Sequence, residues 1–249
     1  MRRCAPGIVT LGDSIMPSVV VMSSGGLKSA VAAAVSAAAE GIYLLVDHGA
    51  PSAARGWAAL ERLCRGTGGW RCVRWTVGPA PSREAGRAGV GGSESGGLRP
   101  ETDLGAVSGS RGLIPAMLGL GVHLATKIGA DRVITGISQV ADEGALGAPF
   151  GSGRPDRRRE FVHAWQCMIE TALPRGTAVR IEAPLIDLRA AEIVRLGLRR
   201  KIAFQNTWSC EQGGESPCQK CESCRVRAAA FREAAAADPL AARPAVARA

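Results

Sequence analysis

The chain has 249 residues, and 46% of them are apolar, which is enough for the core of one domain with or without a small appendage. Eight cysteines in a chain of this length exclude a disulfide-rich scaffold, and no apolar run approaches the length of a membrane span. The formal net charge of +9 favours anionic partners such as nucleotides or RNA, although frequent arginine and alanine make a general compositional bias the alternative. We therefore expect a cytoplasmic protein.

The first predicted elements are a β-branched strand from residue 19 to 22, a Ser/Gly turn, and an alanine-rich helix over residues 27–39. This order presents backbone N–H groups and the positive end of a helix to a phosphate, and paired glycines let the backbone approach the anion. Serine hydroxyls add further donors. An ordinary strand-to-helix turn has the same pattern and stays an alternative. The predicted phosphate site consists of Ser23, Ser24, Gly25, Gly26, Leu27, Lys28 and Ser29.

Further strands are predicted over residues 42–46 and 72–77, with a helix over 52–64 between them. A β-α-β-α-β order is typical of a parallel sheet covered by helices. We therefore expect an α/β fold, doubly wound around a mostly parallel sheet. The Gly-, Ser- and Pro-rich stretch 78–110 interrupts the pattern and predicts a mobile loop, either a flap over a site or disorder without function.

Beyond this loop, apolar spacing predicts a second set of elements. Asp187 is the predicted N-cap of one helix in this set. The predicted helices cover residues 113–128, 161–173, 189–198 and 225–236, and the predicted strands cover 133–136 and 179–182.

Half of the cysteines form a cluster, Cys210, Cys218, Cys221 and Cys224, with the spacing C-x7-C-x2-C-x2-C. Four thiolates on a short segment suit the closed, tetrahedral coordination of structural zinc. An iron–sulfur cluster also takes four cysteines, and reduced thiols or a disulfide pair are the other alternative. We predict structural Zn²⁺ that supports folding rather than chemistry and that holds the end of the domain far from the glycine turn.

These features together resemble the 7-cyano-7-deazaguanine synthases of queuosine biosynthesis, which belong to the N-type ATP pyrophosphatases. The resemblance runs from about residue 19 to 231 and is strongest from residue 113 onward. It implies an adenine nucleotide alpha-hydrolase-like, Rossmann-like fold with a C-terminal zinc-binding helical part. The motifs that carry it are Thr207-Trp208-Ser209-Cys210 followed by the other three cysteines, Arg227 and Phe231; Ala183-Pro184-Leu185-Ile186 with Glu192-Ile193-Val194; and Pro155-Asp156 with Arg158 and Phe161.

The resemblance implies an ATP-dependent ligase with ATP, Mg²⁺ and Zn²⁺ as cofactors. Such an enzyme adenylates the carboxylate of 7-carboxy-7-deazaguanine, ammonia displaces AMP to give an amide, and a second ATP-driven dehydration gives the nitrile. The residues from Ser23 to Ser29 would hold pyrophosphate, Gly136 would lie near the nucleotide or base, and Asp156 and Arg158 would face the substrate. The implied partners are a small deazapurine and ammonia, with no membrane, no stable nucleic-acid complex and a possible homodimer.

Several positions depart from the family pattern. Lys28 occupies an acidic position of the glycine turn, which would remove a magnesium ligand but supply a cation for a phosphate. We therefore place Lys28 with Asp156 and Arg158 among the candidate catalytic residues. The departures also leave two alternatives: a related adenylating enzyme with another acceptor or amine, including a tRNA-modifying one, and a non-catalytic nucleotide-binding homologue. The other departures are Ala50, Gly112, Arg154, Arg157 and Ala190.

The predicted domain organisation has four parts. A disordered extension covers residues 1–17, and Met16 is an alternative start. The ATP pyrophosphatase-like domain covers 18–205, the zinc-binding part covers 206–236, and a disordered tail covers 237–249.

Overall fold

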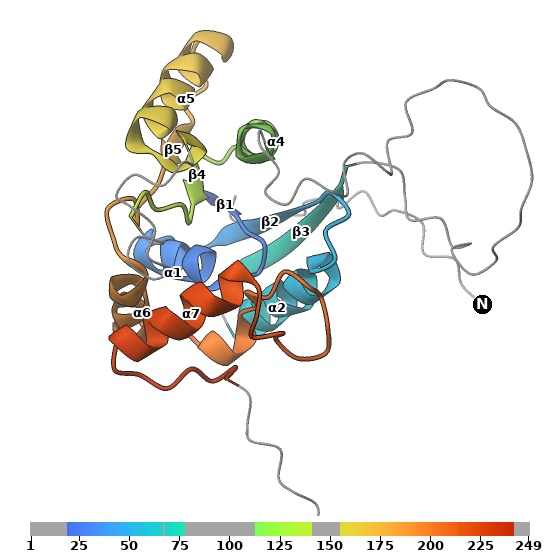
Figure 1. The fold of residues 1–249 in the computed structure, drawn as a ribbon. Helices are drawn as coiled ribbons and strands as arrows, with labels where there is room; N and C mark the ends of the chain where they lie inside the picture. Colours follow the sequence, from blue (N-terminus) through green and yellow to red (C-terminus); the bar gives the residue numbers. More distant parts are fainter. Residues whose placement is uncertain (1–18, 67, 78–112, 141–154, 242–249) are drawn as a thin grey trace, which may run out of the picture.

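The structure is a computed structural model that describes residues 19–66, 68–77, 113–140 and 155–241 (Figure 1). The extension expected over residues 1–17 and the mobile loop expected over 78–110 lie outside the described residues. So do residues 242–249 of the expected tail, and the departures at Gly112 and Arg154.

One parallel sheet forms the centre of the fold, with the strand order β3-β2-β1-β4-β5. The chain runs outward from β1 through β2 to β3, and then returns to the other side of β1 with β4 and β5. The carboxyl ends of β1 and β4 therefore lie side by side at the point where the strand order reverses, which is where open α/β sheets bind ligands. The strands are β1 (Val19–Met22), β2 (Gly41–Asp47), β3 (Trp70–Thr76), β4 (Arg132–Thr135) and β5 (Arg180–Glu182).

Helices cover both faces of this sheet, which confirms the doubly wound α/β fold (Figure 1). Side chains alternate along β1, so that Val19 and Val21 pack with one set of helices and Val20 and Met22 with the other. The first set is α1 (Leu27–Val35), α2 (Ala53–Arg65), α6 (Ala190–Arg199) and α7 (Glu222–Glu233); the second is α4 (Leu113–Ile128) and α5 (Arg159–Ala172). Among the described helices, none combines the length and apolarity that crossing a bilayer requires.

Several helix boundaries differ from the predicted ones. Helix α1 ends at Val35 rather than at residue 39, because the Ser36 hydroxyl donates to the Ala33 carbonyl (2.7 Å) and Ala37 takes a left-handed backbone (φ 56°). Helix α7 begins at Glu222 and ends at Glu233, three residues earlier at each end than predicted.

The prediction that Asp187 caps a helix is wrong. Helix α6 has Arg189 as its N-cap, and the Arg189 backbone N–H donates to the Glu192 carboxylate (2.7 Å). Asp187 instead accepts hydrogen bonds from Arg159 and from the Gln139 amide (2.9 Å). Asp187 therefore connects the segments around α5 and β4 rather than the first turn of α6.

The predicted disordered tail needs a correction at its start. Residues 237–241 belong to the described structure, and Asp238 forms a nearly buried ion pair with Arg227 on α7 (2.9 Å). The sequence pattern around residue 237 is typical of a solvated tail. The ion pair with the buried Arg227 guanidinium explains why residues 237–241 are instead held against the domain. The other predicted domain boundaries stay predictions.

Candidate active site

A pocket of about 450 Å³ opens at the carboxyl ends of β1 and β4. This volume is in the range of pockets that hold small molecules and cofactors. Its walls come from the glycine turn, the ends of β2 and β4, the start of α4 and the segment around the first cysteine. The predicted ligand-binding residues that line it are Ser23, Ser24, Leu27, Lys28, Ser29 and Gly136.

Two glycines determine the path of the loop before α1. Gly25 has φ +80°, and a Cβ there would overlap the backbone of Gly56 on α2. A Cβ on Gly56 would in turn overlap the Ser24 carbonyl oxygen. The loop and the helix therefore meet backbone to backbone, which only a pair of glycines allows. Gly56 was not among the predicted site residues, although a glycine in the interior of a predicted helix is a signal of such a contact.

The hydroxyls of Ser23 and Ser29 hold the loop together. The Gly25 N–H donates to Ser23 Oγ (3.1 Å), the two serine hydroxyls are 2.6 Å apart, and Ser29 Oγ donates to the Gly26 carbonyl (3.0 Å). Only 3% of Ser23 and 7% of Ser29 is exposed, whereas Ser24 is exposed. The first two hydroxyls are therefore engaged within the loop, and Ser24 has the hydroxyl that faces solvent.

The positive end of α1 lies against the end of β4. A Cβ on Gly136 would be 2.7 Å from the Ser29 backbone nitrogen and 2.8 Å from the Lys28 carbonyl carbon. The first turn of α1 contains no acidic residue, and half-buried Lys28 lines the pocket there. The N-terminal end of the α1 dipole thus contributes a positive potential to this corner of the pocket, beside Lys28.

The residues predicted to face the substrate lie outside the described lining of the pocket, and their role stays a prediction. Asp156 and Arg158 belong to the turn before α5, which includes the 3-10 helix Pro155–Arg157. Among the described residues of this turn, Arg157 lines the pocket, whereas Asp156 and Arg158 do not. A 3-10 turn points consecutive side chains in different directions, so that only one of the three faces the pocket.

All four described positions at which the chain departs from the family pattern line the pocket. Besides Lys28 and Arg157, the small residues Ala50 and Ala190 line it. At these positions the pocket wall therefore carries two cationic side chains and two small ones.

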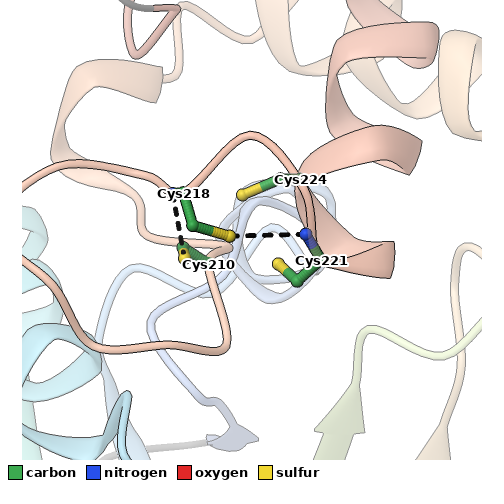
Figure 2. A group of neighbouring side chains, drawn as sticks. All are labelled: Cys210, Cys218, Cys221 and Cys224. Atoms are coloured by element: carbon green, nitrogen blue, oxygen red, sulfur yellow. Dashed lines mark hydrogen bonds between the residues drawn. The ribbon is translucent and has the colours of Figure 1, made fainter.

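The four clustered cysteines lie together, with all their Sγ atoms within 4.8 Å of one another (Figure 2). Backbone N–H groups of Cys218 and Cys221 donate to the sulfurs of Cys210 and Cys218, respectively, at 3.3 Å each. Hydrogen bonds from the N–H groups of Cys221 and Lys220 lower the pKa of Cys218 to about 6, whereas burial raises the pKa of Cys221 and of Cys224. Ideal tetrahedral zinc–thiolate sites have sulfurs about 3.8 Å apart, so this arrangement fits a four-cysteine metal centre.

The prediction that this centre lies far from the glycine turn is wrong. Trp208 and Cys210 line the pocket, and the Trp208 backbone N–H donates to the Gly25 carbonyl (2.8 Å). Gly213 packs so closely on the Pro51 carbonyl that a Cβ there would overlap it. The cysteine segment therefore folds back across α2 and forms one wall of the pocket.

Asp47 ends β2 beside the pocket and is 7% exposed. Burial by itself raises the pKa of Asp47, but hydrogen bonds from Arg74 and from the Gly49 N–H (2.9 Å) outweigh it, and the net effect is a lowered pKa. A lowered pKa in the folded state stabilises the protein above the unfolded pKa, and this stabilisation is lost as the pH falls through the folded pKa.

Replacing Asp47 with asparagine should therefore lower the free energy of unfolding at pH 7 by about 1–3 kcal/mol and flatten its decline below pH 4. Urea unfolding at a series of pH values measures both effects. The matched control is Asp131→Asn, because the Asp131 side chain is 68% exposed and its contact with Arg132 is 3.6 Å. An unchanged acid slope in Asp47→Asn would contradict the assignment.

The family model and the curated relatives that match this chain agree on one family. Residues 111–235, half of the chain, match the family described as "Queuosine biosynthesis protein QueC". The 7-cyano-7-deazaguanine synthase of Oceanobacillus iheyensis is 39% identical over 123 residues, which cover 49% of this chain and 52% of that protein. The synthase of Acidobacterium capsulatum is 41% identical over 123 residues, 49% of each chain. The chain thus spans about half the length of the curated relatives it matches.

A solved structure, the U34-tRNA thiolase NcsA from Methanococcus maripaludis with its [4Fe-4S] cluster, is 15% identical, with a TM-score of 0.41. The likeness covers 88% of this chain and 66% of that one. The family match includes Gly136, Arg157 and the four cysteines, whereas the loop from Ser23 to Ser29 precedes it. The match confirms the resemblance seen in the sequence: the chain belongs to the QueC family of queuosine biosynthesis proteins.

Proposed function

We propose that the chain is an ATP-dependent ligase that converts 7-carboxy-7-deazaguanine and ammonia into 7-cyano-7-deazaguanine through an adenylated carboxylate and an amide. Family membership supports the substrate class, since the curated relatives are named for this product. The observation that carries the proposal is the pocket at the strand reversal, where the N-terminus of α1 meets the end of β4.

A carboxylate reacts with ammonia only after one oxygen becomes a good leaving group. The protein must hold the triphosphate so that the α-phosphorus meets the carboxylate, and must stabilise the charge on departing pyrophosphate. In the proposal, the N–H groups at the start of α1, the Ser24 hydroxyl and the Lys28 ammonium bind that pyrophosphate. Ser23 and Ser29 keep the loop in the conformation that exposes these N–H groups.

The two proposed metals have different donors. Mg²⁺ requires oxygen ligands, and the carboxylates among the described pocket-lining residues are Glu211 and Glu222, on the cysteine side. Zn²⁺ fits the four thiols, and with every ligand supplied by cysteine its contribution is to fold the wall that holds the pocket.

Product analysis by mass spectrometry tests the function. Incubation with ATP, Mg²⁺, ammonium and 7-carboxy-7-deazaguanine should yield AMP, pyrophosphate and a product with the mass of the nitrile, or of the amide if the reaction stops there. AMP formation should require the deazapurine acid. If AMP does not rise above the level without the acid, this chain does not catalyse the proposed reaction.

Reversing the charge of Lys28 tests its role. Because the ammonium would contact phosphate directly, Lys28→Asp should weaken ATP binding by about 2 kcal/mol or more, roughly 30-fold in Kd. Calorimetric titration measures this, and Lys127→Asp, an exposed lysine near the end of α4, is the control. The opposite result, AMP formation in Lys28→Asp but not in the natural chain, would show that the natural chain binds nucleotide without catalysis.

A further inference from the structure

Arg227 on α7 lines the pocket but is only 7% exposed. An arginine in the wall of a nucleotide pocket is ordinarily taken as a phosphate ligand. We propose instead that Arg227 is a positioning residue, which fixes the pocket wall from Phe204 to Cys210, and that Asp238 completes this device. The inference rests on the proposed nucleotide site.

All five N–H groups of the Arg227 guanidinium have partners within the protein. Nε donates to the Asp238 carboxylate (2.9 and 3.1 Å), and Nη2 donates to Asp238 Oδ1 (2.9 Å) and to the Phe204 carbonyl (3.2 Å). Nη1 donates to the hydroxyls of Thr207 (2.8 Å) and Ser209 (3.3 Å). Because a guanidinium has five N–H groups and no acceptor, none is left for a phosphate.

These bonds act on the segment that contacts the glycine turn. Arg227 holds Thr207 and Ser209, the two neighbours of Trp208 in the chain. The Trp208 backbone N–H donates to the Gly25 carbonyl (2.8 Å), and its indole N–H donates to the Cys210 carbonyl (2.9 Å). The guanidinium thereby sets the position of Trp208, which connects this wall of the pocket to the glycine turn.

Asp238 supplies the charge that this arrangement needs. The other acceptors of the guanidinium are neutral, so the Asp238 carboxylate balances a nearly buried cation. Asp238 lies beyond the residues that match the family, and it does not line the pocket. The Leu240 N–H donates to the same carboxylate (3.0 Å) and holds the tail in place. A substitution at Asp238 therefore acts on the pocket only through Arg227.

The test is the affinity of each variant for Mg²⁺–ATP, measured by titration at a temperature well below the thermal unfolding midpoint of that variant. Asp238→Asn should weaken binding by about fivefold or more, because the guanidinium loses its counter-charge and the wall shifts. Arg227→Lys should not preserve the affinity, since a single ammonium cannot bridge the same acceptors. The control is Glu182→Gln, which removes the Arg132–Glu182 ion pair (3.7 Å) outside the pocket lining.

A direct phosphate contact by Arg227 predicts the opposite. Asp238→Asn would then free donors for the ligand, and an unchanged or tighter affinity in this variant would overturn the inference. Should Asp238→Asn fail to fold, Thr207→Val removes one acceptor in a near-isosteric way and should weaken binding several-fold; unchanged binding would also overturn the inference.

Hydrogen exchange of the Trp208 amide gives an independent measurement. If the natural chain binds no ATP, the proposed function fails, but the positioning role still predicts faster exchange of this amide in Asp238→Asn than in Glu182→Gln. Equal exchange in the two variants would exclude that role.

Discussion

Replacing Cys221 with serine is expected to abolish metal binding by the four-cysteine cluster and, with it, ATP binding. The apolar cluster around the cysteines has few buried members, Ala59, Trp208, Cys210 and Cys224, so this wall has little core of its own. Structural zinc contributes about 10–16 kcal/mol of binding free energy to small domains, and most of the order of this segment should depend on it. Cys221 does not line the pocket, so the loss of ATP binding would arise from the wall alone.

Metal analysis, limited proteolysis and ATP titration measure the effect of this substitution. The variant should lose metal, become susceptible to cleavage between α6 and α7, and lose measurable affinity. Cys167→Ser, at an exposed position on α5, is the matched control and should keep all three properties. Iron and acid-labile sulfide in the purified protein would replace the zinc assignment with a cluster. Full metal content and normal ATP affinity in Cys221→Ser would contradict the proposed structural role.

The second large effect is expected from the glycine pair that joins the loop to α2. Gly25→Ala adds the strain of a left-handed backbone, about 1–2 kcal/mol, to a clash with the backbone of Gly56 that no rotamer change relieves. We expect a total cost of about 3 kcal/mol or more in unfolding free energy, together with loss of ATP binding. Urea unfolding and calorimetric titration measure the two quantities.

The chain contains a matched control for each part of this cost. Gly49 also has a positive φ, +86°, but its Cβ would meet nothing within 4 Å, so Gly49→Ala should show the backbone strain alone. Gly56 has the clash without the strain. Alanine in a helix interior normally stabilises by about 1 kcal/mol relative to glycine, so a strongly destabilising Gly56→Ala would show that the contact with the loop dominates. A stabilised Gly56→Ala would contradict the close approach.

Much of the fold could be predicted from the sequence, because it depends on local patterns. The β-branched run before residue 23 can only be a buried strand, and its repetition with intervening helices leaves few arrangements besides a parallel sheet. The cysteine spacing likewise predicted four thiols that meet. The helix ends were less predictable. The Asp187 side chain bonds to Gln139, which is distant in the sequence, and the end of α1 depends on the left-handed backbone of Ala37.

The pocket itself was decided by contacts between segments far apart in the chain. Strand order brings β4 beside β1, which places Gly136 against the start of α1, and a return across α2 brings Trp208 to the carbonyl of Gly25. Sequence alone shows which residues can bind an anion or a metal, since that follows from their chemistry. Which of them face the same cavity, as Arg157 does and Asp156 does not, depends on the packing of whole elements, and this is fixed only when the chain folds.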